Sequence, residues 1–331
     1  MFFALGCYTR MGGPGVGIME EKDGAFRLVC TSDAVKDPTW VMQSPHDPHI
    51  LYAGANLDGK GGVASLLWEG ETLSLLSLQP TGGGSCCHLT VDKEEKYLYA
   101  ASYRDGTVSV LPLDQGKIGP VLQALPYSAP LGPVADRQDC SHAHQCVFRP
   151  GTKELFVCNL GTDQVVVYHK KADGTLEVKY AIPGKAGTGP RHLLFDGPDR
   201  FYLAGELIGW LSMYEFENGA WHCRCTLPTV PKGYETVNTA AAIYKDEGHI
   251  YVSNRGHDSI AKFSLSENGM PALEKLIHTP GACPRDFMLW ENGFLLAQQE
   301  KGGVAFMDEK GVPGPSLPYT GVVRICPLKE T

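Results

Sequence analysis

Short apolar segments of strand length alternate with polar turns along the whole chain. The most regular feature is a pair of large apolar residues, followed by a turn and a segment rich in Val or Ile. This pair recurs as Phe2-Phe3, Leu51-Tyr52, Leu98-Tyr99, Leu155-Phe156, Phe201-Tyr202, Ile250-Tyr251 and Phe294-Leu295. The copies are spaced by about 44 to 57 residues. Seven copies at this period predict an all-β fold, a seven-bladed propeller whose blades are four-stranded antiparallel sheets.

The segments around each pair complete the predicted blade. A strand precedes the pair, as in 192–195, and further strands follow it, as in 210–213 and 175–178. The first repeat lacks a preceding strand, whereas the segment 321–326 has no repeat of its own. We therefore expect this last strand to complete the first blade and close the ring, so that no sheet edge stays open there. No linker or charge run divides residues 1–331, which predicts a single propeller domain.

Polar residues recur at one end of the predicted blades. Arg191 begins a strand and Glu206 ends the next one, and in an antiparallel hairpin these two places lie at the same end. The fourth position after each apolar pair gives Cys7, Asn56, Tyr103, Leu160, Glu206, Arg255 and Gln299. The residues that begin the preceding strands include His88, His144, Arg191 and Arg285. These residues are expected to converge on one mouth of the central channel.

The chemistry of this set indicates an anionic ligand. Each residue alone is explained most simply as a solvated strand end. Together, two His, three Arg and one Glu around one channel are harder to explain in this way, because several buried cations beside one carboxylate need a further anion. The arginine fork suits carboxylate or phosphate.

Composition and charge exclude some partners. The chain is 43% hydrophobic and 20% charged, with a formal net charge of −8, which argues against nucleic acid or an anionic membrane as a partner. The start of the chain lacks the features of a signal peptide, and no segment has the length of a membrane span. We therefore expect the 11 cysteines to be reduced and the protein to be cytoplasmic. The sequence indicates no particular oligomeric state.

No cofactor or metal is expected from the motifs. His142 and His144 are two positions apart and could chelate a metal, but no third ligand follows at a recognisable spacing. Gly82-Gly83-Gly84 precedes a strand, not a helix, so it is interpreted as a turn. The one long connection, 125–140, is rich in Pro and leads into Ser141-His142-Ala143-His144. Long loops in compact domains are often functional.

Several motifs together resemble the family of seven-bladed lactonases. They are 189–195, 205–207, 253–260, 141–145 with 159–163, and 6–9. This family includes cycloisomerase-type 6-phosphogluconolactonases and carboxy-cis,cis-muconate lactonizing enzymes. The resemblance covers the whole chain and implies a propeller with an active site made of a His, an Arg, a Glu and a second Arg. These catalytic residues correspond here to His144, Arg191, Glu206 and Arg255.

The resemblance implies hydrolysis of a small anionic sugar-acid lactone similar to 6-phosphogluconolactone. In this interpretation Arg191, held by Glu206, faces the carbonyl oxygen, and His144 takes a proton from water. Arg255 would bind the anionic group, and the expected substrate contacts also include His88, His142, Arg285 and Gln299. Two alternatives stay open: a cycloisomerase that forms a lactone, and a non-catalytic propeller that binds a protein.

Overall fold

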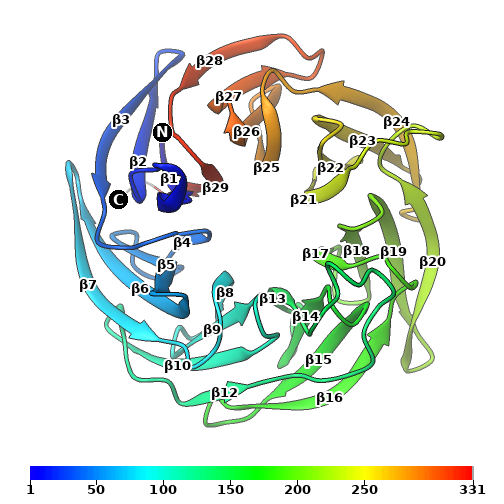
Figure 1. The fold of residues 1–331 in the computed structure, drawn as a ribbon, viewed down its shortest axis with the longest axis horizontal. Helices are drawn as coiled ribbons and strands as arrows, with labels where there is room; N and C mark the ends of the chain where they lie inside the picture. Colours follow the sequence, from blue (N-terminus) through cyan, green and yellow to red (C-terminus); the bar gives the residue numbers. More distant parts are fainter. Residues whose placement is uncertain (330–331) are drawn as a thin grey trace.

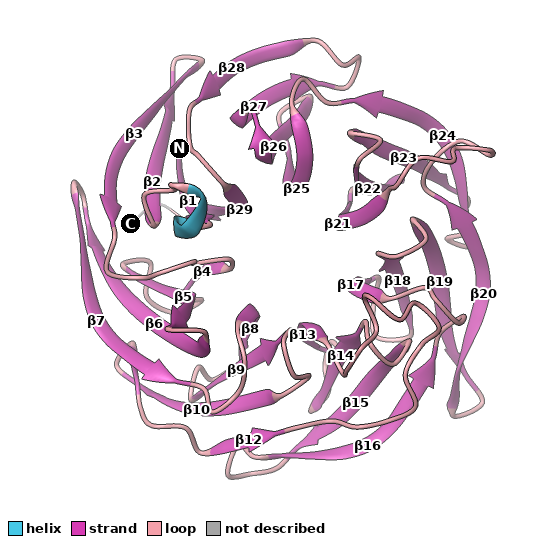
Figure 2. Ribbon diagram, in the orientation of Figure 1, coloured by secondary structure: helices cyan, strands magenta, loops and turns pink. Residues whose placement is uncertain are grey.

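Seven antiparallel sheets surround a central axis in the computed structural model, which describes residues 1–329 (Figure 1). Within these residues there is no α-helix, and the one 3-10 turn, η1 (Thr9–Met11), lies beside the channel (Figure 2). No helix in this part of the chain is long and apolar enough to cross a bilayer. The predicted all-β fold with seven blades is confirmed.

The blades follow one another along the chain, and the inner strand of each blade stands first in the following lists. The first four blades are β29 (Val322–Leu328), β1 (Phe2–Cys7), β2 (Val16–Lys22), β3 (Ala25–Ser32); β4 (Val41–Gln43), β5 (Ile50–Leu57), β6 (Lys60–Glu69), β7 (Thr72–Pro80); β8 (Cys86–Val91), β9 (Tyr97–Ser102), β10 (Val108–Asp114), with β11 (Lys117–Ile118) and β12 (Gln123–Leu125); and β13 (Ala143–Phe148), β14 (Glu154–Asn159), β15 (Gln164–Lys170), β16 (Leu176–Pro183). The last three are β17 (Pro190–Phe195), β18 (Arg200–Gly205), β19 (Trp210–Glu217), β20 (Ala220–Pro228); β21 (Thr239–Lys245), β22 (His249–Arg255), β23 (Ser259–Leu265), β24 (Pro271–His278); and β25 (Ala282–Trp290), β26 (Gly293–Lys301), β27 (Gly303–Asp308), β28 (Pro313–Leu317).

The third blade departs from the pattern at its outer edge. Both β11 and β12 pair with β10, so the outer strand of this blade is divided into two short pieces. The long connection begins directly after β12 and crosses to β13.

The ring is closed by the C-terminal strand, as the sequence predicted. β29 pairs with β1 in antiparallel register, with Ala4 opposite Cys326 and Leu5 opposite Ile325. The first blade therefore takes its inner strand from one end of the chain and its other strands from the opposite end. This pairing removes the open edge that β1 would otherwise present.

The core lies between the blades. The second residue of every apolar pair is at most 1% exposed, and each hydrophobic cluster contains residues from two neighbouring blades. The hydroxyl of Tyr99 donates to the carbonyl of Gly174 at 3.0 Å, and that of Tyr202 to the carbonyl of Gly269 at 2.6 Å, in each case in the next blade. Burial of one such large side chain contributes about 1.5–3 kcal/mol.

The inner strands carry β-bulges near the axis. The register shifts between Cys86 and His88 in β8, between Ala143 and Gln145 in β13, and between Pro190 and His192 in β17. The extra residues are Cys87, His144 and Arg191, and β25 has a comparable shift at Arg285. A bulge leaves one residue unpaired and changes the direction of its side chain, so these four residues face the channel.

Candidate active site

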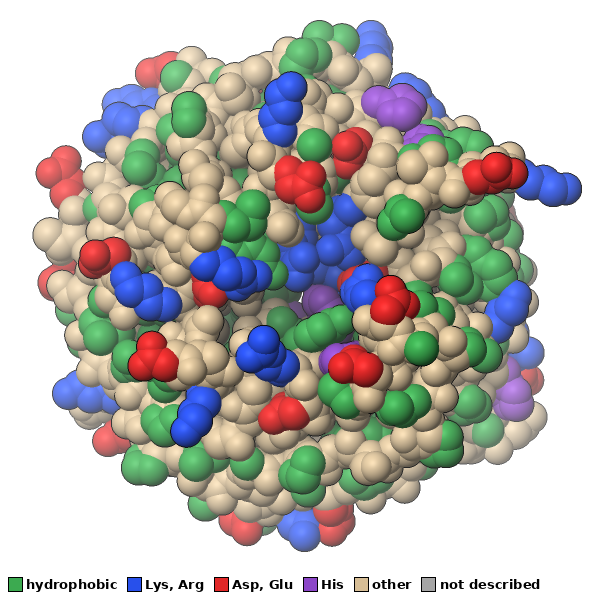
Figure 3. Space-filling model, viewed as in Figure 1, with side chains coloured by type: hydrophobic (Ala, Val, Ile, Leu, Met, Phe, Trp, Pro, Cys, Tyr) green, Lys and Arg blue, Asp and Glu red, His purple; other side chains and the backbone are tan. Residues whose placement is uncertain are grey.

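A cavity of about 570 Å³ opens at the mouth of the channel. Lys and Arg side chains gather around this hollow in the space-filling view (Figure 3). Two carboxylates, Asp37 and Glu206, line it together with five arginines: Arg10, Arg104, Arg137, Arg255 and Arg285. The cavity is therefore basic, although the chain as a whole has a net charge of −8.

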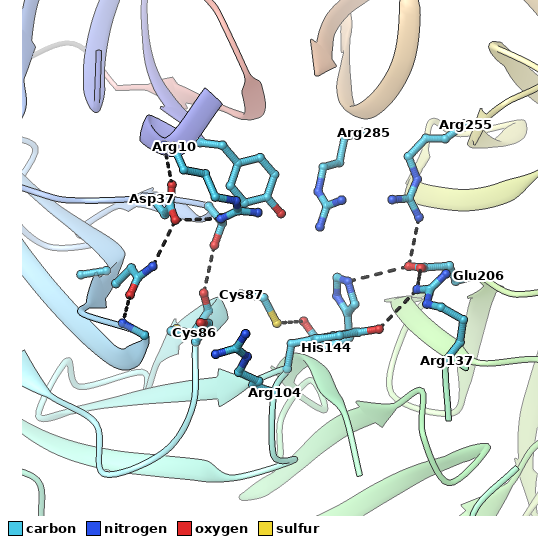
Figure 4. Close-up of a pocket in the computed structure, with 17 residues that line it drawn as sticks. Arg10, Asp37, Cys86, Cys87, Arg104, Arg137, His144, Glu206, Arg255 and Arg285 are labelled. Atoms are coloured by element: carbon cyan, nitrogen blue, oxygen red, sulfur yellow. Dashed lines mark hydrogen bonds and ion pairs between the residues drawn. The ribbon is translucent and has the colours of Figure 1, made fainter. Parts of the chain in front are cut away.

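Glu206 is the centre of a buried ion cluster on one side of the cavity (Figure 4). Its Oε2 lies 3.0 Å from Arg191 Nε and 3.0 Å from Arg255 Nη2. The other oxygen, Oε1, accepts a hydrogen bond from Arg137 Nη2. Because the N–H of Arg191 is not aligned with Oε2, that contact is an ion pair without a hydrogen bond.

The turn before β17 positions Arg191. Both oxygens of Asp163 accept backbone hydrogen bonds, from Gly187 at 2.7 Å and from Gly189 at 2.8 Å. Gly189 has a positive φ of 61°, and a Cβ there would lie 2.5 Å from Leu207 Cγ. Glycine is therefore required at this position, and the turn delivers Arg191 into its bulge.

The cluster determines the charge of its members. Burial alone would raise the pKa of Glu206, but Arg255 and Arg191 outweigh it and hold that pKa well below its usual range. Burial, and next the charge of Arg255, lower the pKa of Arg191 to about 9. At neutral pH the carboxylate and the guanidinium are therefore both charged.

His144 stands beside this cluster as a neutral imidazole. Burial, followed by the charge of Arg191, lowers its pKa well below the usual value, although Glu206 acts in the opposite direction. Its Nε2 lies 3.9 Å from Glu206 Oε2, and its buried Nδ1 has no hydrogen-bond partner within residues 1–329. A neutral imidazole with a free nitrogen can accept a proton.

On the opposite side of the cavity, fewer of the arginines have a carboxylate partner. Arg10 Nη1 pairs with Asp37 Oδ2 at 2.7 Å. Arg285 instead faces Gln299 Oε1 at 3.4 Å and the ring of Tyr8 at 5.5 Å, and it has no carboxylate partner among residues 1–329. Arg104 likewise has no ion pair within that range. Two unpaired guanidinium groups thus remain available to an anion.

The structure brings most of the predicted site residues together. His144, Glu206, Arg255 and Arg285 line the main cavity, whereas Arg191 lines a smaller cavity of about 20 Å³ that also contacts His144. Gln299 contacts Arg285 without lining the main cavity.

The two remaining predicted contacts, His88 and His142, do not line the main cavity. His88 follows the bulge, so its ring packs against Trp40 with ring centroids 3.9 Å apart and tilted planes, and Cys87 takes the position that faces the cavity. The ring of His142 stacks on Tyr103, and its Nδ1 lies 2.5 Å from the carbonyl oxygen of that residue.

His142 belongs to a group with the side chains of two neighbours, Asp139 and Cys140, that sequence spacing had not indicated. Potential ligand atoms of the three residues lie within 4.8 Å of one another. However, His142 Nε2 is hydrogen-bonded to Asp139 at 2.9 Å, and the Cys140 sulfur is 3.7 and 3.8 Å from the two ring nitrogens. Such near-equal distances place the sulfur beside the imidazole instead of along the lone pair of Nε2. The group therefore has the geometry of a loop anchor.

Arg137 is the main residue that sequence reasoning missed. It lies in the long connection between β12 and β13, outside every repeat, so the alignment of blades could not find it. The only sequence signal was an arginine within a long loop, a place where functional residues are common.

The fold and this site together define a propeller with a polar, basic cavity at one end of its axis. A family model described as "Lactonase, 7-bladed beta-propeller" matches residues 2–307, so the chain belongs to the seven-bladed β-propeller lactonase family. This membership assigns it to the hydrolases that act on lactones.

One named relative agrees with this assignment. The chain is 31% identical over 319 residues to a 6-phosphogluconolactonase of Bacillus subtilis, covering 92% of this chain and 90% of the relative. It is 32% identical over 342 residues to an uncharacterized protein of Staphylococcus saprophyticus, covering 99% and 95%. The structure of the periplasmic gluconolactonase of Pseudomonas aeruginosa superposes with a TM-score of 0.88 over 98% of both chains; at 23% identity this similarity supports the fold alone.

Proposed function

We propose that the protein hydrolyses a sugar-acid lactone carrying an anionic group, with 6-phosphogluconolactone as the model substrate. The observation that carries this proposal is the buried cluster of His144, Glu206 and Arg255 beside a cavity that holds two unpaired arginines. The family membership and the name of the Bacillus subtilis relative support the same reaction class.

In the proposed reaction, attack of water on the lactone carbonyl places negative charge on the carbonyl oxygen. Arg255 lines the cavity and is 12% exposed, whereas Arg191 lies deeper and is 3% exposed. We therefore assign stabilisation of this oxygen to Arg255, and to Arg191 the positioning of Glu206, which changes the roles inferred from sequence. Loss of one such donor typically lowers the rate by about 10²–10³-fold.

His144 is the proposed general base. As a neutral imidazole it takes a proton from the attacking water while the new C–O bond forms. Glu206, 3.9 Å from Nε2, stabilises the resulting imidazolium. The same proton then passes to the ring oxygen as the C–O bond of the ring breaks. The product acid ionises, so each turnover releases one proton to the solvent.

Arg285 and Arg104 are the proposed contacts for the anionic group. Arg285 lies between the Arg10–Asp37 pair and Glu206 in the close-up of the cavity, and Arg104 lies near Cys86 and Cys87 (Figure 4). A phosphate or carboxylate held there would leave the lactone ring directed toward His144. The polar cavity favours this function over the docking of a protein partner, which requires an exposed apolar surface.

We also propose a cytoplasmic location. All eleven cysteines are free thiols, as expected in a reducing compartment.

The direct test uses purified protein and 6-phosphogluconolactone generated by oxidation of glucose 6-phosphate. Proton release is measured against the spontaneous rate. Acceleration by the wild type and by the surface control His222→Ala, with loss of kcat in His144→Ala, is the expected result. No acceleration with this lactone or with gluconolactone would overturn the proposal, and cyclisation of a carboxymuconate would favour the lactone-forming alternative.

A further inference from the structure

Arg137 reaches Glu206 from outside the blades. It lies in the connection between β12 and β13, and its Nη2 contacts both Glu206 Oε1 and, at 3.3 Å, the hydroxyl of Tyr103. Tyr103 belongs to the third blade and Glu206 to the fifth, so the side chain spans the mouth of the fourth blade. The other nitrogens of Arg137 have no protein partner within residues 1–329.

The two oxygens of Glu206 have different environments. Oε2 faces the buried cations Arg191 and Arg255. Among the described residues, Arg137 is the only partner of Oε1. The side chain of Arg137 is 35% exposed, compared with 3% for Arg191 and 12% for Arg255. Arg137 is thus the member of the cluster that a ligand can reach most easily from the cavity.

The backbone around Arg137 is firmly attached. The neighbouring Gln138 is 1% exposed, and its amide donates to the carbonyl of Leu160 at 2.8 Å. Gly132 donates its backbone N–H to the carbonyl of Gly161 at 2.9 Å. A change in the partner of Arg137 therefore requires rotation of a long side chain and no movement of the connection.

We propose that Arg137 makes the reaction sensitive to substrate charge: an anionic group held in the cavity by Arg285 and Arg104 takes Arg137 as a further partner, and Arg137 then releases Glu206 Oε1. This inference rests on the proposed function. With Arg137 withdrawn, more of the negative charge of Glu206 stabilises the protonated His144. A neutral lactone offers Arg137 no competing anion, so Oε1 stays occupied. Arg137 is in this sense a positioning residue that acts through Glu206.

The experiment supplies the anion and the lactone ring as two separate molecules. Hydrolysis of neutral glucono-1,5-lactone is measured with and without inorganic phosphate, after subtraction of the enzyme-free rate at the same phosphate concentration. In the wild type, phosphate is expected to raise kcat/KM by about fivefold or more, the usual lower range of coupling between two sites. The matched control is Asp136→Ala, which removes an exposed charge from the same turn.

Arg137→Ala should lose this activation, and its rate on the neutral lactone without phosphate should approach the activated wild-type rate. Arg137→Lys should keep part of the activation, because the charge remains but the fork is lost. Equal activation of wild type and Arg137→Ala, or simple competitive inhibition of the wild type by phosphate, would overturn the proposal.

Calorimetry provides a readout that does not depend on turnover. Inorganic phosphate should bind the wild type and Asp136→Ala more tightly than Arg137→Ala, and equal affinities would contradict the role of Arg137. If neither lactone is hydrolysed while phosphate binding depends on Arg137, the proposed function fails but the anion contact stands.

Discussion

Replacement of Glu206 by glutamine tests the ion cluster most directly. Glu206→Gln keeps the size of the side chain and removes the charge that Arg191 and Arg255 face at 3.0 Å. Both arginines would then stand close together in a buried site without a counter-charge. Breaking a buried ion pair by removing one partner costs about 3–5 kcal/mol.

This cost can be converted into a melting temperature. For 331 residues the entropy of unfolding is about 0.7 kcal/mol per degree, so the expected decrease in Tm is about 4–7 °C. The arginines hold the pKa of Glu206 below its unfolded value of about 4.3. The stabilisation is therefore fully present above that unfolded pKa, and it is lost as pH falls through the lower, folded pKa.

The assay is thermal or denaturant unfolding of wild type and variant between pH 3 and pH 8. A matched control is Glu215→Gln, because Glu215 also pairs with two arginines, Arg200 and Arg224, but is 28% exposed. Its replacement should cost less than about 1 kcal/mol. A Glu206→Gln protein as stable as the wild type at pH 7, or equal losses for both variants, would refute the reasoning.

Three further predictions concern the base, the metal and the closing strand. Because burial and Arg191 lower the pKa of His144, the acidic limb of the kcat profile should fall below pH 6.5; a limb above this value would exclude His144 as the base. Activity should survive exhaustive chelation, and recovery that requires one added divalent ion would contradict the expected absence of a metal. Deletion of residues 321–331 should abolish cooperative unfolding by circular dichroism, because β1 then loses its inner partner; a truncated protein that still melts cooperatively would show that β29 is dispensable.

The repeat pattern was sufficient to predict the blades because the apolar pairs occupy the same place in each second strand. It also placed Glu206 and Arg255, which end such strands. It did not place His88 relative to the main cavity, since period-two alternation assumes an uninterrupted strand, whereas the bulge at Cys87 shifts the alternation by one residue. A bulge is a property of two paired strands, so it leaves no clear mark in one of them.

The connection that carries Arg137 shows a second limit of prediction from the sequence. Its conformation depends on contacts to another blade, such as that of Gln138 with Leu160, and not on its own periodicity. Sequence could indicate that this segment was functional, but not which side chain would reach Glu206. The pairing of Arg191 with Glu206 followed from the hairpin, but the depth of Arg191 below the main cavity depends on the packing of three blades.

The pairing of the two chain ends has a consequence for how the protein can be encoded. Phe2 lies opposite Leu328, so β29 and β1 form a hairpin from which only the connecting turn is missing. If a short turn joined these ends, the polypeptide would be a closed circle of blades. It could then be cut at another surface turn, such as Gly197-Pro198, without separating the inner strands from their neighbours. The order in which a gene specifies the blades is therefore independent of the ring that they form.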